Sequence, residues 1–135
     1  MYLLDTNVLS EFVRKSPNAK LLDEVRRRSP ETLTTSCICV MELRHGAVRT
    51  GNAGALWSRI ETLILRRVSV LEVRVEDAIL AGEILASLWS AGKPIEVEDV
   101  LIAAGALSRG FTVVTHNVSH FRRIPGLKVE DWMAA

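Results

Sequence analysis

Short apolar runs alternate along the chain with segments in which apolar residues return at helical spacing. Short runs of apolar and β-branched residues predict strands, whereas apolar residues three or four positions apart predict helices. The predicted strands are residues 2–4, 32–35, 68–73, 111–115 and, as a short last strand, 127–129.

Helices are predicted between these strands. The first begins at residues 5–7, and the second has Leu21, Leu22 and Val25 on one side. The third covers 37–48 and is capped by Ser36, and the fourth carries Trp57, Ile60, Leu63 and Ile64 at helical spacing. The fifth has Ile79, Gly82, Ala86 and Trp89 along one face, and the sixth covers 97–108. Residues 116–121 predict a turn or a short helix. Gly51, Asn52 and Gly54 predict a loop, and Gly92 and Gly110 predict helix ends. We expect the face of Trp57, Ile60 and Ile64 to belong to the core.

The alternation of strands and helices predicts an α/β fold in which a mostly parallel central sheet is flanked by helices. A chain of 135 residues has room for one continuous core. It shows no repeat, low-complexity tract or linker, so we expect a single domain over residues 1–135.

The composition is that of an ordinary soluble protein, with 48% hydrophobic and 24% charged residues. The net charge of +1 decides nothing about nucleic acid, because a basic groove and an acidic site can offset one another. Arginine clusters at 26–28, 66–67 and 122–123 are expected to be solvated helix ends, and only as a set to contact phosphate. A signal-peptide pattern and a membrane-length apolar stretch are both missing, so we expect a cytoplasmic protein with no membrane partner.

The two cysteines, Cys37 and Cys39, are separated by one residue. This spacing matches no common zinc framework. In a helix their side chains point about 200° apart, which is too divergent for joint ligation. We therefore expect small, buried, apolar residues in a reducing compartment.

Acidic residues fall where predicted strands end. Asp5 directly follows the first strand, Glu42 lies about two turns into the helix after the second strand, and Asp99 lies in the first turn of the helix over 97–108. Singly, Asp5 and Asp99 are explained equally well as helix caps, and Glu42 as a surface residue. Because ligands of a parallel sheet bind outside the carboxyl ends of its strands, the three together predict one shared site.

Converging carboxylates repel one another, and such clusters usually hold a hard cation. Magnesium and manganese prefer oxygen ligands and keep several waters. A metal held in this way can lower the pKa of a bound water and stabilise the leaving oxygen of a phosphodiester. The three acids therefore predict metal-dependent phosphoryl-transfer chemistry without a nucleophilic serine or cysteine.

Four motifs, in order along nearly the whole chain, resemble PIN domains of the VapC toxin type. Residues 4–11 (LDTNVLSE) resemble the opening motif, 40–46 (VMELRHG) the second acidic motif and 99–104 (DVLIAA) the third. Residues 114–117 (VTHN), with Phe121, the segment 124–127 (IPGL) and Trp132, are similar to the closing segment.

The resemblance implies a PIN fold and an endoribonuclease that depends on Mg²⁺ or Mn²⁺, the toxin of a VapBC-type toxin–antitoxin system. It implies an RNA substrate, a cognate VapB-type antitoxin in the active-site groove, and a homodimer. It assigns catalysis and metal ligation to Asp5, Glu42 and Asp99. Supporting roles fall to neutral residues, namely Thr6, Asn7, Thr115 and Asn117. Capping of the first helix would explain Thr6 and Asn7 equally well.

One departure from the family pattern concerns a fourth acid in the closing motif. The family often has it at the position of Asn117 or three residues later, where this chain has His120. Neither residue supplies a negative charge at neutral pH, so we expect one well-occupied metal. A lone histidine in a turn is more often neither a ligand nor a proton donor.

Two other functions stay open. A catalytically inactive PIN-like module would act only through RNA or protein contacts; the missing fourth acid favours it, and the three intact acids count against it. A receiver-like or phosphatase-like α/β protein would use Asp5 as a phosphoacceptor. Such sites place a second acid beside that residue or a lysine after a late strand, and here Thr115, His116 and Asn117 follow the fourth strand.

Overall fold

The computed structural model describes residues 1–134, and its centre is a five-stranded sheet in the order β3-β2-β1-β4-β5. Every neighbouring pair of strands is parallel, with Leu3 paired to Thr34 on one side and to Val113 on the other. The predicted α/β fold with a parallel sheet is confirmed. The strands are β1 (Tyr2–Leu4), β2 (Leu33–Ser36), β3 (Ser69–Leu71), β4 (Thr112–Val114) and β5 (Val129–Glu130).

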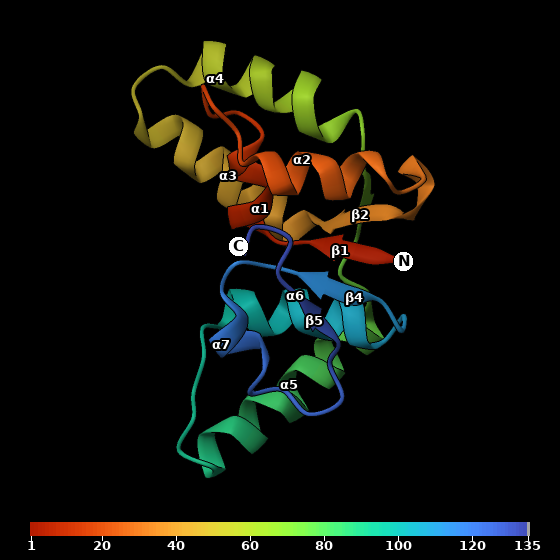
Figure 1. The fold of residues 1–135 in the computed structure, drawn as a ribbon. Helices are drawn as coiled ribbons and strands as arrows, with labels where there is room; N and C mark the ends of the chain where they lie inside the picture. The colour runs from red at the N-terminus through yellow and green to blue at the C-terminus, as the bar shows by residue number, and fades with distance from the viewer. Residues whose placement is uncertain (135) are drawn as a thin grey trace.

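Helices surround this sheet on both sides (Figure 1). In the view of Figure 1, the first four helices lie towards the half of the sheet formed by β1 and β2, and the last three lie towards β4 and β5. The helices are α1 (Thr6–Glu11), α2 (Ala19–Arg26), α3 (Cys37–Arg49), α4 (Ala53–Ile60), α5 (Val75–Ser90), α6 (Val97–Leu107) and α7 (Val118–Phe121), with a 3₁₀ turn η1 (Pro30–Thr32) and a π-helical turn η2 (Glu61–Leu65).

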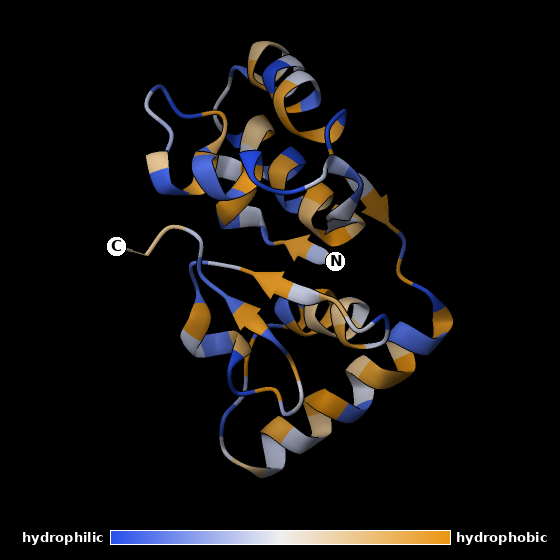
Figure 2. Ribbon diagram, turned by 45° about the vertical axis from the view of Figure 1, so that its right-hand side comes forward, coloured by the Kyte–Doolittle hydropathy of each residue, from blue (hydrophilic) through white to orange (hydrophobic). Residues whose placement is uncertain are grey.

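The core is formed by the strands and by α6, the helix that the sequence predicts to be buried on most sides. Leu3 and Val113 are fully buried in adjacent strands, and a run of α6 residues from Ile102 to Ala106 is buried as well. Figure 2 shows hydrophobic residues concentrated in the central strands. Within the described residues, no helix combines the length and the apolarity that crossing a membrane requires.

Several element boundaries differ from the sequence predictions. The second strand begins and ends one residue later than predicted, and the fourth is one residue shorter at each end. Three further differences have local explanations or are larger. Gly54 lies inside α4 and not in a loop, because Gly51, with φ of 76°, and Asn52 complete the turn before the helix begins. The third strand is shorter than 68–73, since β3 is an edge strand that pairs only with β2. The last strand is Val129–Glu130 and begins two residues later than predicted.

Two helix faces have opposite environments. Ile60 and Ile64 are buried with Trp57 packed against the core, which confirms the core prediction for that face. The face of α5 that carries Ile79 and Trp89 is exposed, and the helix is anchored by its other side, which presents the buried residues Asp77, Ala81, Ile84 and Leu88. The predicted glycine stop is confirmed, since Gly92 follows α5 in a left-handed conformation with φ of 69°.

The closing segment returns to the first strand through aromatic contacts. Trp132 is buried, and its ring meets that of Tyr2 edge to face at 5.0 Å between centroids. The guanidinium of Arg28 lies 4.0 Å from the centroid of the Trp132 ring and also forms an ion pair with Glu24. Of the first arginine cluster, Arg28 therefore contributes to packing at this corner, whereas Arg26 and Arg27 are exposed as expected.

Candidate metal centre

Asp5 occupies the junction where β1 passes directly into α1. Its backbone N–H donates to the carbonyl oxygen of Val114 at 2.9 Å, which continues the pairing of β1 with β4 by one residue. Its side chain caps the helix, because Oδ1 accepts a hydrogen bond from the backbone N–H of Thr6 at 2.8 Å. The carboxylate is thereby fixed at the carboxyl end of the central strand.

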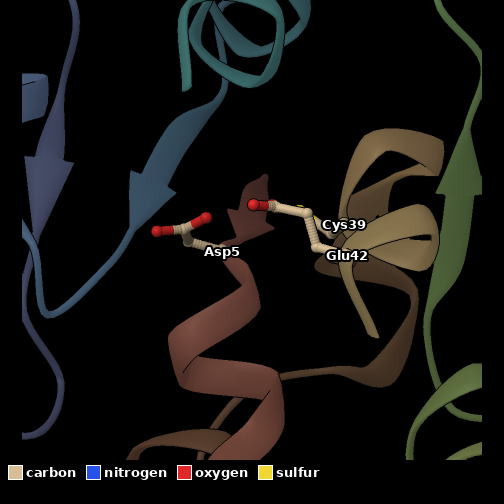
Figure 3. A group of neighbouring side chains, drawn as sticks. All are labelled: Asp5, Cys39 and Glu42. Carbon is tan, nitrogen blue, oxygen red and sulfur yellow. The ribbon is translucent and has the colours of Figure 1, made fainter. Parts of the chain in front are cut away.

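Glu42 reaches the same point from α3. Ser36 ends β2 and begins α3, since its hydroxyl oxygen accepts a hydrogen bond from the N–H of Ile38 at 3.0 Å. Glu42 lies in the second turn of that helix, and its Oε1 accepts a hydrogen bond from the Thr6 hydroxyl at 2.7 Å. Figure 3 shows the Glu42 carboxylate pointing towards that of Asp5.

The loop after β4 orients the Asp5 carboxylate from the other side. Thr115 is fully buried, and its hydroxyl donates to Asp5 Oδ2 at 2.8 Å. The Asn7 amide donates to the same Asp5 oxygen at 3.1 Å, and its Oδ1 accepts from the backbone N–H of His116 at 3.0 Å. Asn117 donates through its backbone N–H to the Thr115 hydroxyl at 2.9 Å. The four residues expected to support the site all take part in one network with Asp5 or Glu42.

Asp99 approaches from the first turn of α6 and faces the closing segment. His120 Nδ1 lies 3.5 Å from Asp99 Oδ2 and 2.9 Å from the Asn117 amide nitrogen. Asp99 is not one of the residues whose ligand atoms lie within 4.8 Å of those of Asp5 and Glu42, although its charge contributes to raising the pKa of Asp5. The structure therefore places His120 against an acid of the site, a contact that the sequence pattern did not predict.

The electrostatics of the site are those of an acid cluster without a counter-charge. Burial raises the pKa of Asp5 to about 6, against the hydrogen bonds from Thr115 and Thr6 that lower it, and the charges of Asp99 and Glu42 raise it further. Among residues 1–134, no lysine or arginine forms an ion pair with any of the three acids. This donor set of uncompensated carboxylate oxygens fits a divalent cation.

Cys39 is an additional donor that the sequence analysis expected only as a small packing residue. Its side chain is fully buried, and burial raises the pKa of the thiol to about 11. One ligand atom each from Asp5, Cys39 and Glu42 lies within 4.8 Å of the other two. A sequence signal for this placement existed, because Cys39 and Glu42 are three residues apart and so share one face of α3.

An open polar cleft of about 640 Å³ lies next to the hydrogen-bond network of Asp5, although none of the three acids lines it. Its lining includes Asn7 and Asn117 from the site, together with Arg14 and His116. Glu11, which is buried beneath the cleft, accepts a hydrogen bond from the backbone N–H of Asn18 at 2.9 Å and pairs with Arg14 at 3.2 Å. The cleft therefore presents hydrogen-bonding groups and an arginine whose charge is compensated by Glu11.

Comparison with protein families matches residues 2–127 to the PIN domain. The chain is 35% identical to a tRNA(fMet)-specific endonuclease VapC of Salmonella typhimurium over 136 residues, which cover 97% of each protein. It is 36% identical to the plasmid stability protein StbB of Pseudomonas syringae pv. tomato over 139 residues, covering 99% of this chain and all of that protein.

Solved structures resemble the chain over the same extent. A chain in the crystal structure of VapBC2 from Rickettsia felis, bound to a DNA fragment from their promoter, superposes with a TM-score of 0.89 at 27% identity. That superposition covers 97% of this chain and 98% of the other. The similarity therefore extends through every element that carries a residue of the acid cluster.

Proposed function

This chain belongs to the PIN-domain family, and we propose that it is the toxin of a VapBC-type toxin–antitoxin system, an endoribonuclease that hydrolyses RNA phosphodiester bonds with a divalent metal. The observation that carries the proposal is the convergence of Asp5 and Glu42 on one point, with Asp99 near enough to raise the pKa of Asp5. Within the described residues, no lysine or arginine pairs with these acids, and His120 lies 3.5 Å from Asp99. The relatives named as ribonucleases or endonucleases support the reaction class.

Asp5, Glu42 and Asp99 would hold the metal, which we propose to be Mg²⁺ or Mn²⁺ because hard ions take carboxylate oxygens. When bound, such an ion polarises the scissile phosphate, lowers the pKa of a water and stabilises charge on the leaving oxygen. The absence of a fourth acid leads us to expect one well-occupied ion in the RNA-free protein.

The protein's own groups keep the carboxylates in place. The Thr115 hydroxyl and the Asn7 amide both donate to Asp5 Oδ2, so this oxygen is fixed in direction. The Thr6 hydroxyl holds Glu42 Oε1 and thereby ties α3 to α1. Such neutral donors orient acids without cancelling their charge, which is the property that a cation site requires.

The RNA would lie in the polar cleft that Asn7, Arg14, His116 and Asn117 line. Its volume of about 640 Å³ falls in the range of roughly 300–1,000 Å³ that is typical of ligand pockets. The amides would supply hydrogen bonds to sugar or base edges, and Arg14 would contact a phosphate by leaving its pair with Glu11.

We further propose a VapB-type antitoxin as the partner and a homodimer as the resting assembly, with all 135 residues in one PIN domain. Complexes of VapB with VapC among the similar structures support the first point. Exposed apolar side chains on α5, including Ile79 and Trp89, support the second, because large exposed apolar patches usually serve contacts. Two free cysteines fit a reducing cytoplasm.

Cleavage of a structured RNA by the purified chain tests this function. We expect cleavage with Mg²⁺ or Mn²⁺, its loss with a chelator, and its loss in Asp99→Asn under matched metal. Full cleavage by Asp99→Asn, or cleavage that the chelator leaves intact, would remove the proposal. A folded, metal-binding protein that cleaves no RNA would instead favour the inactive PIN-like module.

A further inference from the structure

Cys39 adds a sulfur atom to the acid pair that the proposed function uses. Its Sγ and one carboxylate oxygen each of Asp5 and Glu42 lie within 4.8 Å of one another. Figure 3 shows Cys39 behind Glu42 on the same helix, so that both approach Asp5 from α3. Cys37, two residues earlier in α3, is half-buried and is not part of this group.

A second observation, independent of the cysteine, indicates that this point takes a cation. Only 5% of Asp5 is exposed, and its carboxylate accepts hydrogen bonds from neutral donors but pairs with no lysine or arginine of residues 1–134. A buried carboxylate without a cationic partner is costly unless a bound ion neutralises it. The carboxylates therefore favour a bound cation, and the thiol favours cations that bind sulfur.

The Cys39 thiol has weak partners in the protein, because the hydroxyls of Thr35 and Thr6 and the backbone of Ser36 lie near its sulfur. Its Sγ lies 3.8 Å from the carbonyl oxygen of Leu4, a long contact for a poor donor. Zinc binds cysteine at about 2.3 Å and carboxylate oxygen at about 2.0–2.2 Å in a tetrahedron. Donor atoms that already lie within 4.8 Å would move inward by about 1 Å to share one such ion.

We propose that Asp5, Cys39 and Glu42 form a mixed sulfur–oxygen site for a thiophilic divalent cation such as Zn²⁺. Thiolate ligands favour Zn²⁺ over Mg²⁺, whose ligands are oxygens. Binding forms one metal–sulfur bond and releases the thiol proton to solvent. The inference rests on the proposed function, because the thiophilic ion uses two of the same carboxylates and so excludes the hard ion. Zinc would then hold the nuclease in an inactive state.

Cobalt(II) spectroscopy on the RNA-free protein tests the sulfur bond directly. Co²⁺ takes zinc sites, and a cobalt–thiolate bond gives a charge-transfer band in the near ultraviolet. We expect this band in the unmodified chain and in Cys37→Ala, and its loss in Cys39→Ser, which keeps a small polar side chain against Leu4. A band that persists in Cys39→Ser, or a missing band in the unmodified chain, overturns the proposal. A missing band in the unmodified chain is measured without any variant, so misfolding of Cys39→Ser cannot explain it.

Competition between Zn²⁺ and Mn²⁺, followed by the electron paramagnetic resonance signal of free Mn²⁺, tests the consequence. We expect Zn²⁺ to displace Mn²⁺ from the unmodified chain and from Cys37→Ala at similar concentrations. In Cys39→Ser the required Zn²⁺ concentration should rise at least about tenfold, since even indirect partners of a metal contribute that much. Equal displacement from all three proteins overturns the proposal. If the proposed metal site of the nuclease is wrong, the result differs from equal displacement, because Mn²⁺ does not bind to the unmodified chain at all.

Discussion

Two buried aspartates, Asp5 and Asp77, have opposite electrostatic environments. Only 5% of Asp5 and 1% of Asp77 is exposed, so burial alone does not distinguish them. Burial raises the pKa of Asp5 to about 6, with hydrogen bonds and nearby acids as smaller effects. For Asp77 burial also raises the pKa, but hydrogen bonds from Ser108, the Arg74 backbone and Arg109 outweigh it and lower the value to about 2.

The environment of Asp77 is that of a structural ion pair. Arg109 Nη1 donates to Asp77 Oδ2 at 3.0 Å, the Ser108 hydroxyl donates to Oδ1 at 2.6 Å, and the Arg74 backbone N–H donates to Oδ2 at 3.0 Å. These bonds join the first turn of α5 to the end of α6. Every charge is compensated within the protein, so no ligand is required.

The two sites lie at opposite ends of the same helix. Asp99 stands in the first turn of α6, and Arg109 follows its last turn, ten residues further on, or about 15 Å at 1.5 Å per residue. The comparison teaches that a buried acid marks a functional site only when the protein leaves its charge uncompensated. The acids around Asp5 meet this condition, and Asp77 does not.

The largest expected effect is the loss of RNA cleavage in Asp5→Asn. Removing a single preorganised group at a reacting centre costs about 10²–10³-fold, and a metal ligand should cost at least the upper value. The fold should stay intact or become more stable, because carboxylate repulsion is relieved. Matched RNA cleavage assays and thermal unfolding check both parts. RNA cleavage by Asp5→Asn at the unmodified rate would contradict the role of Asp5 as a metal ligand.

The next effect is on stability at the other end of α6. Asp77→Ala leaves Arg109, only 13% exposed in its side chain, without its buried partner, so unfolding should require about 3 kcal/mol less. Asp23→Ala, which breaks a solvent-exposed pair with Arg26, is the matched control and should cost less than about 1 kcal/mol. Denaturant unfolding measures both. Similar losses in the two variants would contradict the account of Asp77.

The stability of the fold should depend on pH through the ion pair of Asp77. The pKa of Asp77 is lowered in the folded protein, so the carboxylate stabilises the fold above its ordinary value of 3.8 and loses this contribution as the pH falls towards 2. The interval between 3.8 and about 2 corresponds to about 2 kcal/mol. The stability difference between the unmodified chain and Asp77→Asn should therefore shrink by this amount from pH 5 to pH 2. A difference that stays constant over this range would show that the charge of Asp77 is not what stabilises the fold.

Much of the fold and part of the site could be predicted because they depend on local patterns. Short apolar runs identified the strands, and capping residues such as Ser36 fixed where α3 begins. Parallel topology alone then brings Asp5 and Glu42 to the same edge of the sheet. The edge strand β3 was harder, since pairing on one side only shortens it in a way that composition does not encode.

Contacts between distant segments could not be predicted in the same way. His120 meets Asp99 because α7 packs against the start of α6, and nothing in the sequence near His120 specifies that contact. Arg109 and Ser108 pair with Asp77 only after α5 and α6 lie side by side. Cys39 was interpreted by its distance from Cys37, although its spacing to Glu42 is what decides its surroundings.

A smaller effect should separate supporting groups from metal ligands within the first site. Asn117→Ala removes a side-chain contact with His120 and leaves the backbone hydrogen bond to Thr115 in place. We expect cleavage to fall by about tenfold, the lower end of the range for groups that orient a metal ligand. The converse variant, Asn117→Asp, should raise metal affinity, because it adds a charge beside the site. Loss of cleavage as severe as in Asp99→Asn would make Asn117 a direct ligand.

Calorimetric titration of Mn²⁺ into the RNA-free protein tests the central claim most directly, since it compares the two buried aspartates without any substrate. The account predicts one Mn²⁺ site in the unmodified chain, the same site in Asp77→Asn, and no measurable binding in Asp5→Asn. Unchanged Mn²⁺ binding in Asp5→Asn would contradict it, because the uncompensated acids would then not be what holds the ion.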